Sequence, residues 1–212
     1  MIAKPYAAVS ALLVLGMFAV AAVIALRMPV ALAANFARVA LLFFIPALAA
    51  LFWLLFAAVP WITPRGRNLF QSQSAYGAIW LAVTSMSAAS FSVALGPVFH
   101  LAWAGPNLVH AASGIALIVI GNVSGKLRPN HFAGIRTPWT LADDEVWDKT
   151  HRFGGWIFVI CGFVVLNAAL IFDASATTRI ATGATLATAI VVIGASWHFA
   201  RQKRARLKGD NI

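Results

Sequence analysis

The sequence predicts an all-α fold, a polytopic membrane bundle of six transmembrane helices. Three observations carry that prediction: 61% of the 212 residues are hydrophobic, 10% are charged, and the mean hydropathy is +0.85. Soluble domains carry roughly 25% charged residues, and no aqueous fold covers repeated apolar runs of bilayer-spanning length. Because lipid offers no hydrogen-bond partners, such runs satisfy their backbone groups as helices.

Six apolar runs, each roughly 16 to 21 residues long, fit a hydrocarbon core of about 30 Å. The breaks between them carry Pro, Gly, Asn or charge, which mark loops. We predict a single integral membrane domain over residues 1–212, with a polar loop at 124–153 and a basic tail at 200–212. The predicted spans are 7–26, 39–59, 75–95, 108–123, 154–172 and 180–199.

The first run also has features of a secretory signal, because Lys4 precedes it and the small-residue segment 31–34 follows it. However, the run is longer than a usual signal core, and Arg27 separates it from the small residues. We therefore predict an uncleaved transmembrane helix.

Basic residues predict the orientation, since Lys and Arg in short loops stay on the cytoplasmic side of a membrane. With six spans, one side holds only Arg27, Arg38 and Arg179. The prediction is therefore that both termini and the 124–153 loop are cytoplasmic. Aromatic residues expected in the headgroup layer are Trp61, Tyr76, Trp103, Trp156 and Trp197. The cytoplasmic side would hold the other 13 of the 16 basic residues: Lys4, Arg65, Arg67, Lys126, Arg128, Arg136, Lys149, Arg152, Arg201, Lys203, Arg204, Arg206 and Lys208.

The formal net charge of +10 is spread along this predicted inner edge, which argues against direct nucleic-acid binding. The tail 201–208 is expected to lie against anionic lipid headgroups, with a partner-binding tail as the alternative. Cys161 is the only cysteine and lies within a span, so the chain forms no internal disulfide and has no CxxC redox motif.

The spans offer few ionisable groups for a proton relay, because all six acidic residues fall outside the apolar cores. The third span instead carries hydroxyls and small residues, many at four-residue spacing, which lets helices pack closely. We favour helix packing, with a polar path for a solute as the alternative. The residues concerned are Ala78, Ala82, Thr84, Ser85, Ser87, Ala88, Ala89, Ser90 and Ser92.

Five histidines raise the question of a metal site. His100 and His110 bracket a predicted outer turn, whereas His131, His151 and His198 lie at the predicted inner face. Two histidines without a nearby carboxylate or cysteine are weak evidence for a metal. We expect ordinary interfacial hydrogen bonds, no metal site and no cofactor.

The 124–153 loop is the densest polar segment. Pro138 biases Thr137 toward an extended backbone, and Thr140 followed by Asp143 resembles a helix N-cap with an acid at the third helical position. We therefore predict a short amphipathic helix from Leu141 onward, in the connection between the fourth and fifth spans. Its expected ion pairs are Glu145 with Lys149 and Asp148 with Arg152, and Trp147 and His151 share one helix face.

Arg136 is the candidate binding residue of this loop, because its paired donors match a carboxylate or a phosphate. Trp139 would add a stacking wall or an interface anchor. The alternative is a loop folded back on the bundle, in which Arg136 pairs with Asp143, Asp144 or Glu145. Residue spacing leaves both interpretations open.

The same loop carries a motif known from other proteins. Asn130-x-x-x-Gly134-Ile-Arg-Thr-Pro-Trp-Thr-Leu141, followed by Glu145-Val-Trp147 and Thr150-His151-x-x-Gly154, resembles the signature of the SdpI family of bacterial membrane proteins. The resemblance covers roughly residues 108–172, and the first half has only the general character of membrane helices. It implies a functional loop, for a ligand or a partner, made of Asn130, Gly134, Arg136, Thr137, Pro138, Trp139, Thr140, Trp147 and His151.

The resemblance implies a protein of the bacterial cytoplasmic (inner) membrane that gives immunity to a membrane-active peptide toxin. A cytoplasmic transcriptional repressor is the partner implied for a second role in signalling. A loop on the cytoplasmic side suits such a regulator, or a structural gate, better than first contact with an external peptide. Two alternatives stay open: a transporter or channel for a small solute, and a membrane enzyme that uses His151, Arg136 and the loop carboxylates. No catalytic residue is assigned, and the oligomeric state stays open.

Overall fold

The computed structural model describes residues 4–27 and 36–209, and its regular elements within those residues are all helices. The segment 31–34, the alternative signal cleavage site, lies outside the described residues. The helices in chain order are α1 (Lys4–Arg27), α3 (Phe36–Ile62), α4 (Arg67–Gln71), α5 (Gln73–Phe99), α6 (Asn107–Ser124), α7 (Pro138–Ala142), α8 (Asp144–Ile171) and α9 (Ala174–Gly209).

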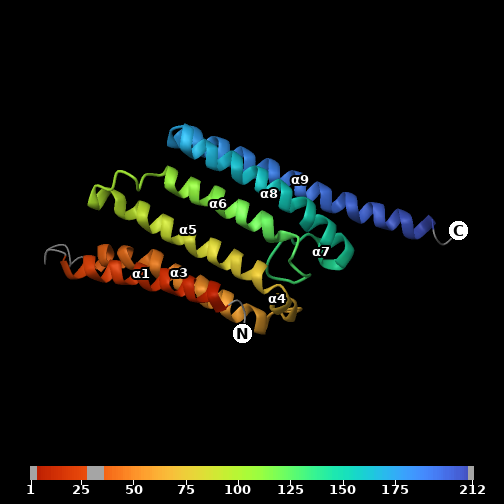
Figure 1. Cartoon of the computed structure of the whole chain (residues 1–212), viewed down its shortest axis with the longest axis horizontal. Helices are drawn as coiled ribbons and strands as arrows, with labels where there is room; N and C mark the ends of the chain where they lie inside the picture. Colours follow the sequence, from red (N-terminus) through yellow and green to blue (C-terminus); the bar gives the residue numbers. More distant parts are fainter. Residues whose placement is uncertain (1–3, 28–35, 210–212) are drawn as a thin grey trace.

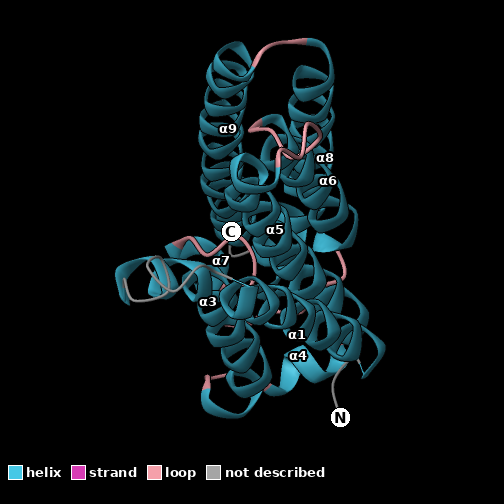
Figure 2. Cartoon of the chain, turned by 90° about the vertical axis from the view of Figure 1, so that its left-hand side faces the viewer, coloured by secondary structure: helices cyan, strands magenta, loops and turns pink. Residues whose placement is uncertain are grey.

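Six of these helices are long and apolar enough to cross a membrane, which confirms an all-helical protein with six candidate spans. Figure 1 shows α1 and α3 along one edge of the bundle, α8 and α9 along the opposite edge, and α5 and α6 between them. Figure 2, which looks along the bundle, separates the same two pairs. The start of α1 and the end of α9 lie at the end of the bundle that also carries α4 and α7 (Figure 1).

Aromatic side chains fill the core near α4. Phe56 stacks on Tyr76 and on Trp80, with ring centroids 5.4 Å and 5.9 Å away. Tyr76 is fully buried, and its hydroxyl donates to the carbonyl of Phe56 at 2.7 Å. The prediction of Tyr76 as an interfacial aromatic is therefore wrong, because its polar tip finds a backbone acceptor inside the bundle. The other aromatics predicted at the interface are exposed, namely Trp61, Trp103, Trp156 and Trp197.

Glycines bring α6 and α8 into close contact. A Cβ on Gly121 would lie 2.5 Å from the carbonyl oxygen of Gly155, and a Cβ on Gly162 would lie 2.5 Å from that of Gly114. Small residues allow this approach of two backbones, which is a principal source of helix association in lipid. The contact holds α8 against α6 directly beside the 124–153 loop.

Four hydroxyls of α5 donate within their own helix. Thr84, Ser87, Ser90 and Ser92 each donate to the carbonyl four residues earlier, at 3.0 to 3.3 Å. Their donors are therefore used by the backbone. This arrangement supports the helix-packing interpretation of the third span over a polar path for a solute.

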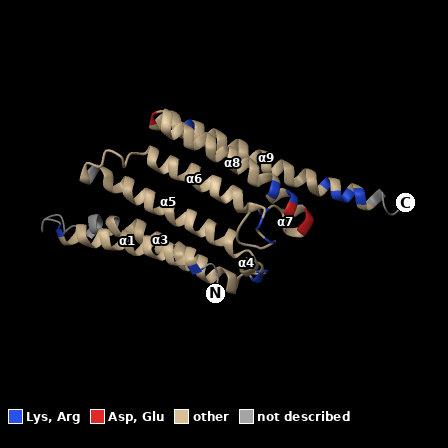
Figure 3. Ribbon diagram, in the orientation of Figure 1, with Lys and Arg blue, Asp and Glu red and all other residues tan. Residues whose placement is uncertain are grey.

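The last two helices are longer than the sequence predicted. α9 continues through Gly209, beyond the predicted span 180–199, so most of the predicted basic tail is helical. α8 runs unbroken from Asp144 to Ile171, so the predicted amphipathic segment and the fifth span form one helix. Figure 3 shows most of the basic and acidic residues at the end of the bundle that carries α4, α7 and the end of α9.

Candidate functional site

Residues 125–137 lead from α6 to α7 and fold over the first turns of α8. Asn130 is 1% exposed, and its side-chain amide organises this loop. Its Oδ1 accepts from the backbone N–H groups of Phe132 at 2.8 Å and Ala133 at 2.7 Å. Its Nδ2 donates to the carbonyls of Arg128 and Ala133. Because these four bonds use the full capacity of an amide, Asn130 shapes the loop and has no group left for a ligand.

Trp147 and His151 form the buried centre of the signature. They stack with ring centroids 3.9 Å apart, which confirms that they share a helix face, and they are only 0% and 1% exposed. The indole N–H of Trp147 donates to the carbonyl of Leu127 at 2.8 Å. This bond ties the start of the loop to α8.

His151 uses both ring nitrogens to hold the loop. Nδ1 donates to the carbonyl of Trp147 at 2.9 Å, and Nε2 accepts from the backbone N–H of Ile135 at 2.9 Å. These contacts require the neutral ring with its proton on Nδ1. Gly134 lies against the ring with φ of +117°, and a Cβ there would meet Nε2. His151 is therefore a positioning residue, and neither of its ring nitrogens is free to act as an acid or base.

Two N-caps connect the loop to its helices. Thr137 caps α7: its Oγ1 accepts from the N–H of Thr140 at 3.3 Å, and Thr140 Oγ1 accepts from the N–H of Thr137 at 2.9 Å. Asp143 caps α8 by accepting from the N–H groups two and three residues later. The predicted cap at Thr140 is wrong. Pro138 occupies the first helical position, which proline prefers, and so the cap falls on Thr137.

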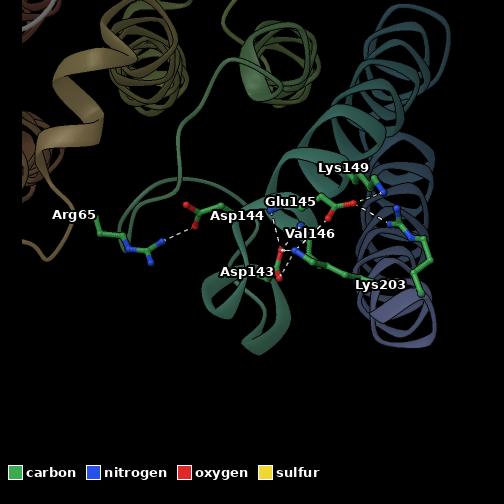
Figure 4. A network of polar contacts seen from close by, with 8 residues as sticks. Arg65, Asp143, Asp144, Glu145, Val146, Lys149 and Lys203 are labelled. Carbon is green, nitrogen blue, oxygen red and sulfur yellow. Dashed lines mark hydrogen bonds and ion pairs between the residues drawn. The ribbon is translucent and has the colours of Figure 1, made fainter. Parts of the chain in front are cut away.

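An ion cluster joins the start of α8 to the end of α9 (Figure 4). Lys203 Nζ lies 2.7 Å from Asp143 Oδ2 and 3.1 Å from Glu145 Oε2, and Arg206 lies 2.9 Å from Glu145 Oε1. Burial alone raises the pKa of Asp143, but the hydrogen bonds from Lys203 and from two backbone N–H groups hold that pKa below its usual value. The cluster clamps the extension of α9 to α8.

The structure confirms one of the two predicted i,i+4 ion pairs. Lys149 lies 2.7 Å from Glu145, with the acid N-terminal as the helix dipole favours. Asp148 and Arg152 form no ion pair in the part of the chain that the structure describes.

Arg136 lies on the outside of the loop. Its side chain is exposed, and its guanidinium donates to the carbonyl of His131 at 2.9 Å. The alternative in which Arg136 pairs with Asp143, Asp144 or Glu145 is wrong, because these acids form ion pairs with other basic residues. Asp144, for example, lies 2.8 Å from Arg65. Pro138, two residues further along the chain, is also exposed.

Polar residues around α4 hold the loop from the opposite side, a role that their spacing in the sequence does not predict. Asn68 Nδ2 donates to the carbonyl of Pro129 at 2.6 Å. The backbone N–H of Arg128 donates to Ser72 Oγ at 2.9 Å. The feature that could have indicated this contact is the hydrophilic stretch 63–74, which is predicted on the same side of the membrane as the 124–153 loop.

His110, which the sequence predicts at the outer face together with His100, is hydrogen-bonded to α9. Its Nε2 lies 3.1 Å from Thr178 Oγ1, on α9. His131 is hydrogen-bonded to the carbonyl of Pro64 and His198 to the side chain of Gln202, whereas the ring of His151 is bonded within the signature. The five histidines thus do not converge on one centre.

Two adjoining grooves open between α7 and the extension of α9. One has a volume of about 290 Å³ and is bordered by Pro138 and Asp143 from one side and Lys203 from the other. The second has a volume of about 260 Å³. Trp139 and Arg204 border both grooves, so this part of the signature is accessible from outside.

The fold and the loop define a polytopic helical membrane protein with a packed polar connection between its fourth and fifth candidate spans. Residues 126–197 of this chain match the SdpI/YfhL protein family. The chain is also 46% identical over 52 residues to "Immunity protein SdpI" of Bacillus subtilis (strain 168). This chain is therefore similar to the SdpI/YfhL family over residues 126–197, about a third of its length.

The match to the Bacillus protein covers 24% of this chain and 25% of that relative, so the similarity spans about a quarter of its length. No solved structure matches the chain. The family segment starts later than the predicted resemblance at 108–172 and extends further, into α9 as far as residue 197. It thus contains the loop from residue 126 onward, α7, α8 and most of the helix that packs against them.

Proposed function

We propose that this protein is an SdpI-like immunity protein of a bacterial cytoplasmic membrane, which protects its cell against a membrane-active peptide toxin. The observation that carries the proposal is the 46% identity to a protein named for immunity. The geometry of the signature fits a role without catalysis, because Asn130 and His151 use their polar atoms to hold the loop.

In this proposal both termini, the loop and α7 face the cytoplasm. Support comes from the basic residues gathered at that end of the bundle (Figure 3), since Lys and Arg in short loops are retained on the cytoplasmic side. The toxin then meets the opposite ends of the helices or the bilayer itself, and the loop is free for a partner inside the cell.

A second part of the proposal is that the outer surface of the loop recruits a cytoplasmic transcriptional repressor. Arg136 and Pro138 are exposed signature residues, and they are held in place by the buried Asn130 and Thr137. Exposed arginine on a rigid backbone is a frequent energetic centre of protein interfaces. The side chain of Arg136 needs only to give up its bond to a backbone carbonyl of the same loop.

Expression in a bacterium killed by a pore-forming or depolarising peptide tests the immunity proposal. The wild-type chain should raise survival and preserve the membrane potential, measured with a potential-sensitive dye. Arg136→Ala should reduce both to the level of the empty vector at equal protein in the membrane. Arg128→Ala is the matched control, since Arg128 is an exposed arginine of the same loop. Equal killing with and without the wild-type chain, across a panel of such peptides, would refute the proposal.

A further inference from the structure

The groove of about 260 Å³ between α7 and α9 combines two arginines with two tryptophans. It is lined by Arg201, Arg204 and Trp197 of α9 and by Trp139 of α7. We propose that this groove binds the phosphate of an anionic phospholipid. The proposal is independent of the immunity function, because it follows from the charge, the aromatic content and the position of the groove.

The charges on the extension of α9 divide between two faces. Lys203 and Arg206 point to α8, where Asp143 and Glu145 neutralise them. Arg201 and Arg204 form no ion pair with any carboxylate among the residues that the structure describes. One face of the helix thus holds the protein together, while the other presents two uncompensated cations to a ligand.

The uncompensated arginines continue a lipid-facing stripe of α9. Side chains that recur every three or four residues lie on one face of a helix, and the exposed stripe passes from aliphatic to aromatic to basic. With a rise of about 1.5 Å per residue, the arginines lie roughly 12 to 17 Å beyond the last aliphatic member, toward the headgroup region. The stripe consists of Leu186, Ile190, Ile193, Trp197, Arg201 and Arg204.

The two tryptophans give the groove the character of a membrane interface. Trp197 is 48% exposed, and the guanidinium of Arg201 lies 5.4 Å from the centre of its ring. A cation held over an indole face keeps its N–H groups at the edge for an acceptor. Trp139 closes the groove from α7, and tryptophan rings favour the headgroup layer. A phosphate with attached acyl chains matches both parts of this lining.

The carboxylate that borders the adjoining groove is already paired with a lysine. Asp143 borders the adjoining groove of about 290 Å³, where Lys203 lies 2.7 Å from its carboxylate. The lining of the 260 Å³ groove itself is Trp139, Trp197, Ala200, Arg201 and Arg204. Guanidinium groups bind phosphate oxygens in pairs, so two arginines supply the donors that a phosphodiester needs.

Lipid retention by the full chain tests the proposal. The protein is reconstituted in nanodiscs with equal amounts of phosphatidylglycerol and phosphatidylcholine, released into mild detergent, and its bound lipids are counted by native mass spectrometry. The wild type should retain more phosphatidylglycerol than phosphatidylcholine. In R201Q/R204Q, the preference should fall by roughly tenfold for each arginine, since each loses a charge-assisted hydrogen bond to the phosphate. Trp139→Leu should lower it without a change in charge.

A charge-matched variant separates a site from general surface attraction. K126Q/R128Q removes two exposed cations of the loop and should leave the preference unchanged. The proposal is overturned if this control loses as much of the preference for phosphatidylglycerol as R201Q/R204Q does. It is also overturned if the wild type retains both lipids equally. Soluble glycerol 3-phosphate should fail to displace the lipid; displacement would assign the groove to a free phosphate and overturn the lipid assignment. Equal elution volume and helical circular dichroism establish that the variants fold.

Discussion

Replacement of Gly134 by alanine probes the packing at the centre of the signature loop. Gly134 has φ of +117°, where an L side chain costs about 1–3 kcal/mol. A Cβ would also meet Nε2 of His151, so the ring must move and its 2.9 Å bond from the N–H of Ile135 is lost. A buried donor without a partner costs about 1–3 kcal/mol. We therefore expect Gly134→Ala to destabilise the protein by roughly 2–6 kcal/mol.

Thermal unfolding of the purified protein in detergent measures this effect, with tryptophan fluorescence as the probe because Trp147 stacks on His151. Gly183→Ala is the matched control. A Cβ at Gly183 meets nothing within 4 Å, and alanine is favoured over glycine inside a helix by about 1 kcal/mol. The control should therefore unfold at the same temperature as the wild type or a higher one.

A double-mutant cycle tests the reason for the effect. In a His151→Ala background the imidazole is absent, so only the backbone strain at Gly134 remains. The cost of Gly134→Ala should then fall by about 1–3 kcal/mol, a coupling expected of residues in direct contact. An equal cost in both backgrounds would refute the view that glycine is needed at 134 to make room for the histidine ring.

Two further predictions concern the helices around this loop. Gly162→Val should separate α6 from α8, since even a Cβ would lie 2.5 Å from the carbonyl oxygen of Gly114. In size-exclusion chromatography this variant should shift to aggregates. Gly194→Val is the control, because a Cβ at Gly194 meets nothing within 4 Å, and it should stay monodisperse. Asp143→Asn keeps a capping side chain but loses the ion pair with Lys203, about 0.5–1 kcal/mol at neutral pH. Because folding lowers the pKa of Asp143, its contribution is present above the unfolded pKa near 4 and is lost as pH falls through the folded pKa. The stability difference between wild type and Asp143→Asn should therefore shrink below about pH 4, and a pH-independent difference would contradict the assignment.

The six candidate spans could be predicted from hydropathy, because lipid leaves an apolar run no other way to satisfy its backbone. The ends of the helices could not be predicted in the same way. α9 continues to Gly209, and this polar part is stabilised by Lys203 and Arg206 on the carboxylates of Asp143 and Glu145. Those partners lie about 60 residues earlier in the chain, a distance at which residue spacing gives no signal.

Part of the local structure of the loop could be predicted from the sequence. Thr137 is the N-cap of α7, as expected from a proline at the first helical position. The acid at position 143 instead led to the wrong prediction of Thr140 as the cap. The shared face of Trp147 and His151 followed from helical periodicity. Their burial did not, because it requires residues 125–137 to fold across them through a bond from Trp147 to the carbonyl of Leu127.

The division of the signature into inward and outward residues limits the chemistry that this loop can perform. Asn130 and His151 donate and accept only within the protein, so they determine where the backbone lies and offer nothing to a substrate. Arg136 and Trp139 are accessible, and they face different surroundings: one faces the outside of the loop and the other the groove beside α9. A partner bound at the first and a lipid bound at the second would both act on the short stretch 136–139. The backbone of this stretch is fixed by the cap at Thr137, so the outward side chain of Arg136 and the groove-lining ring of Trp139 are held in defined directions.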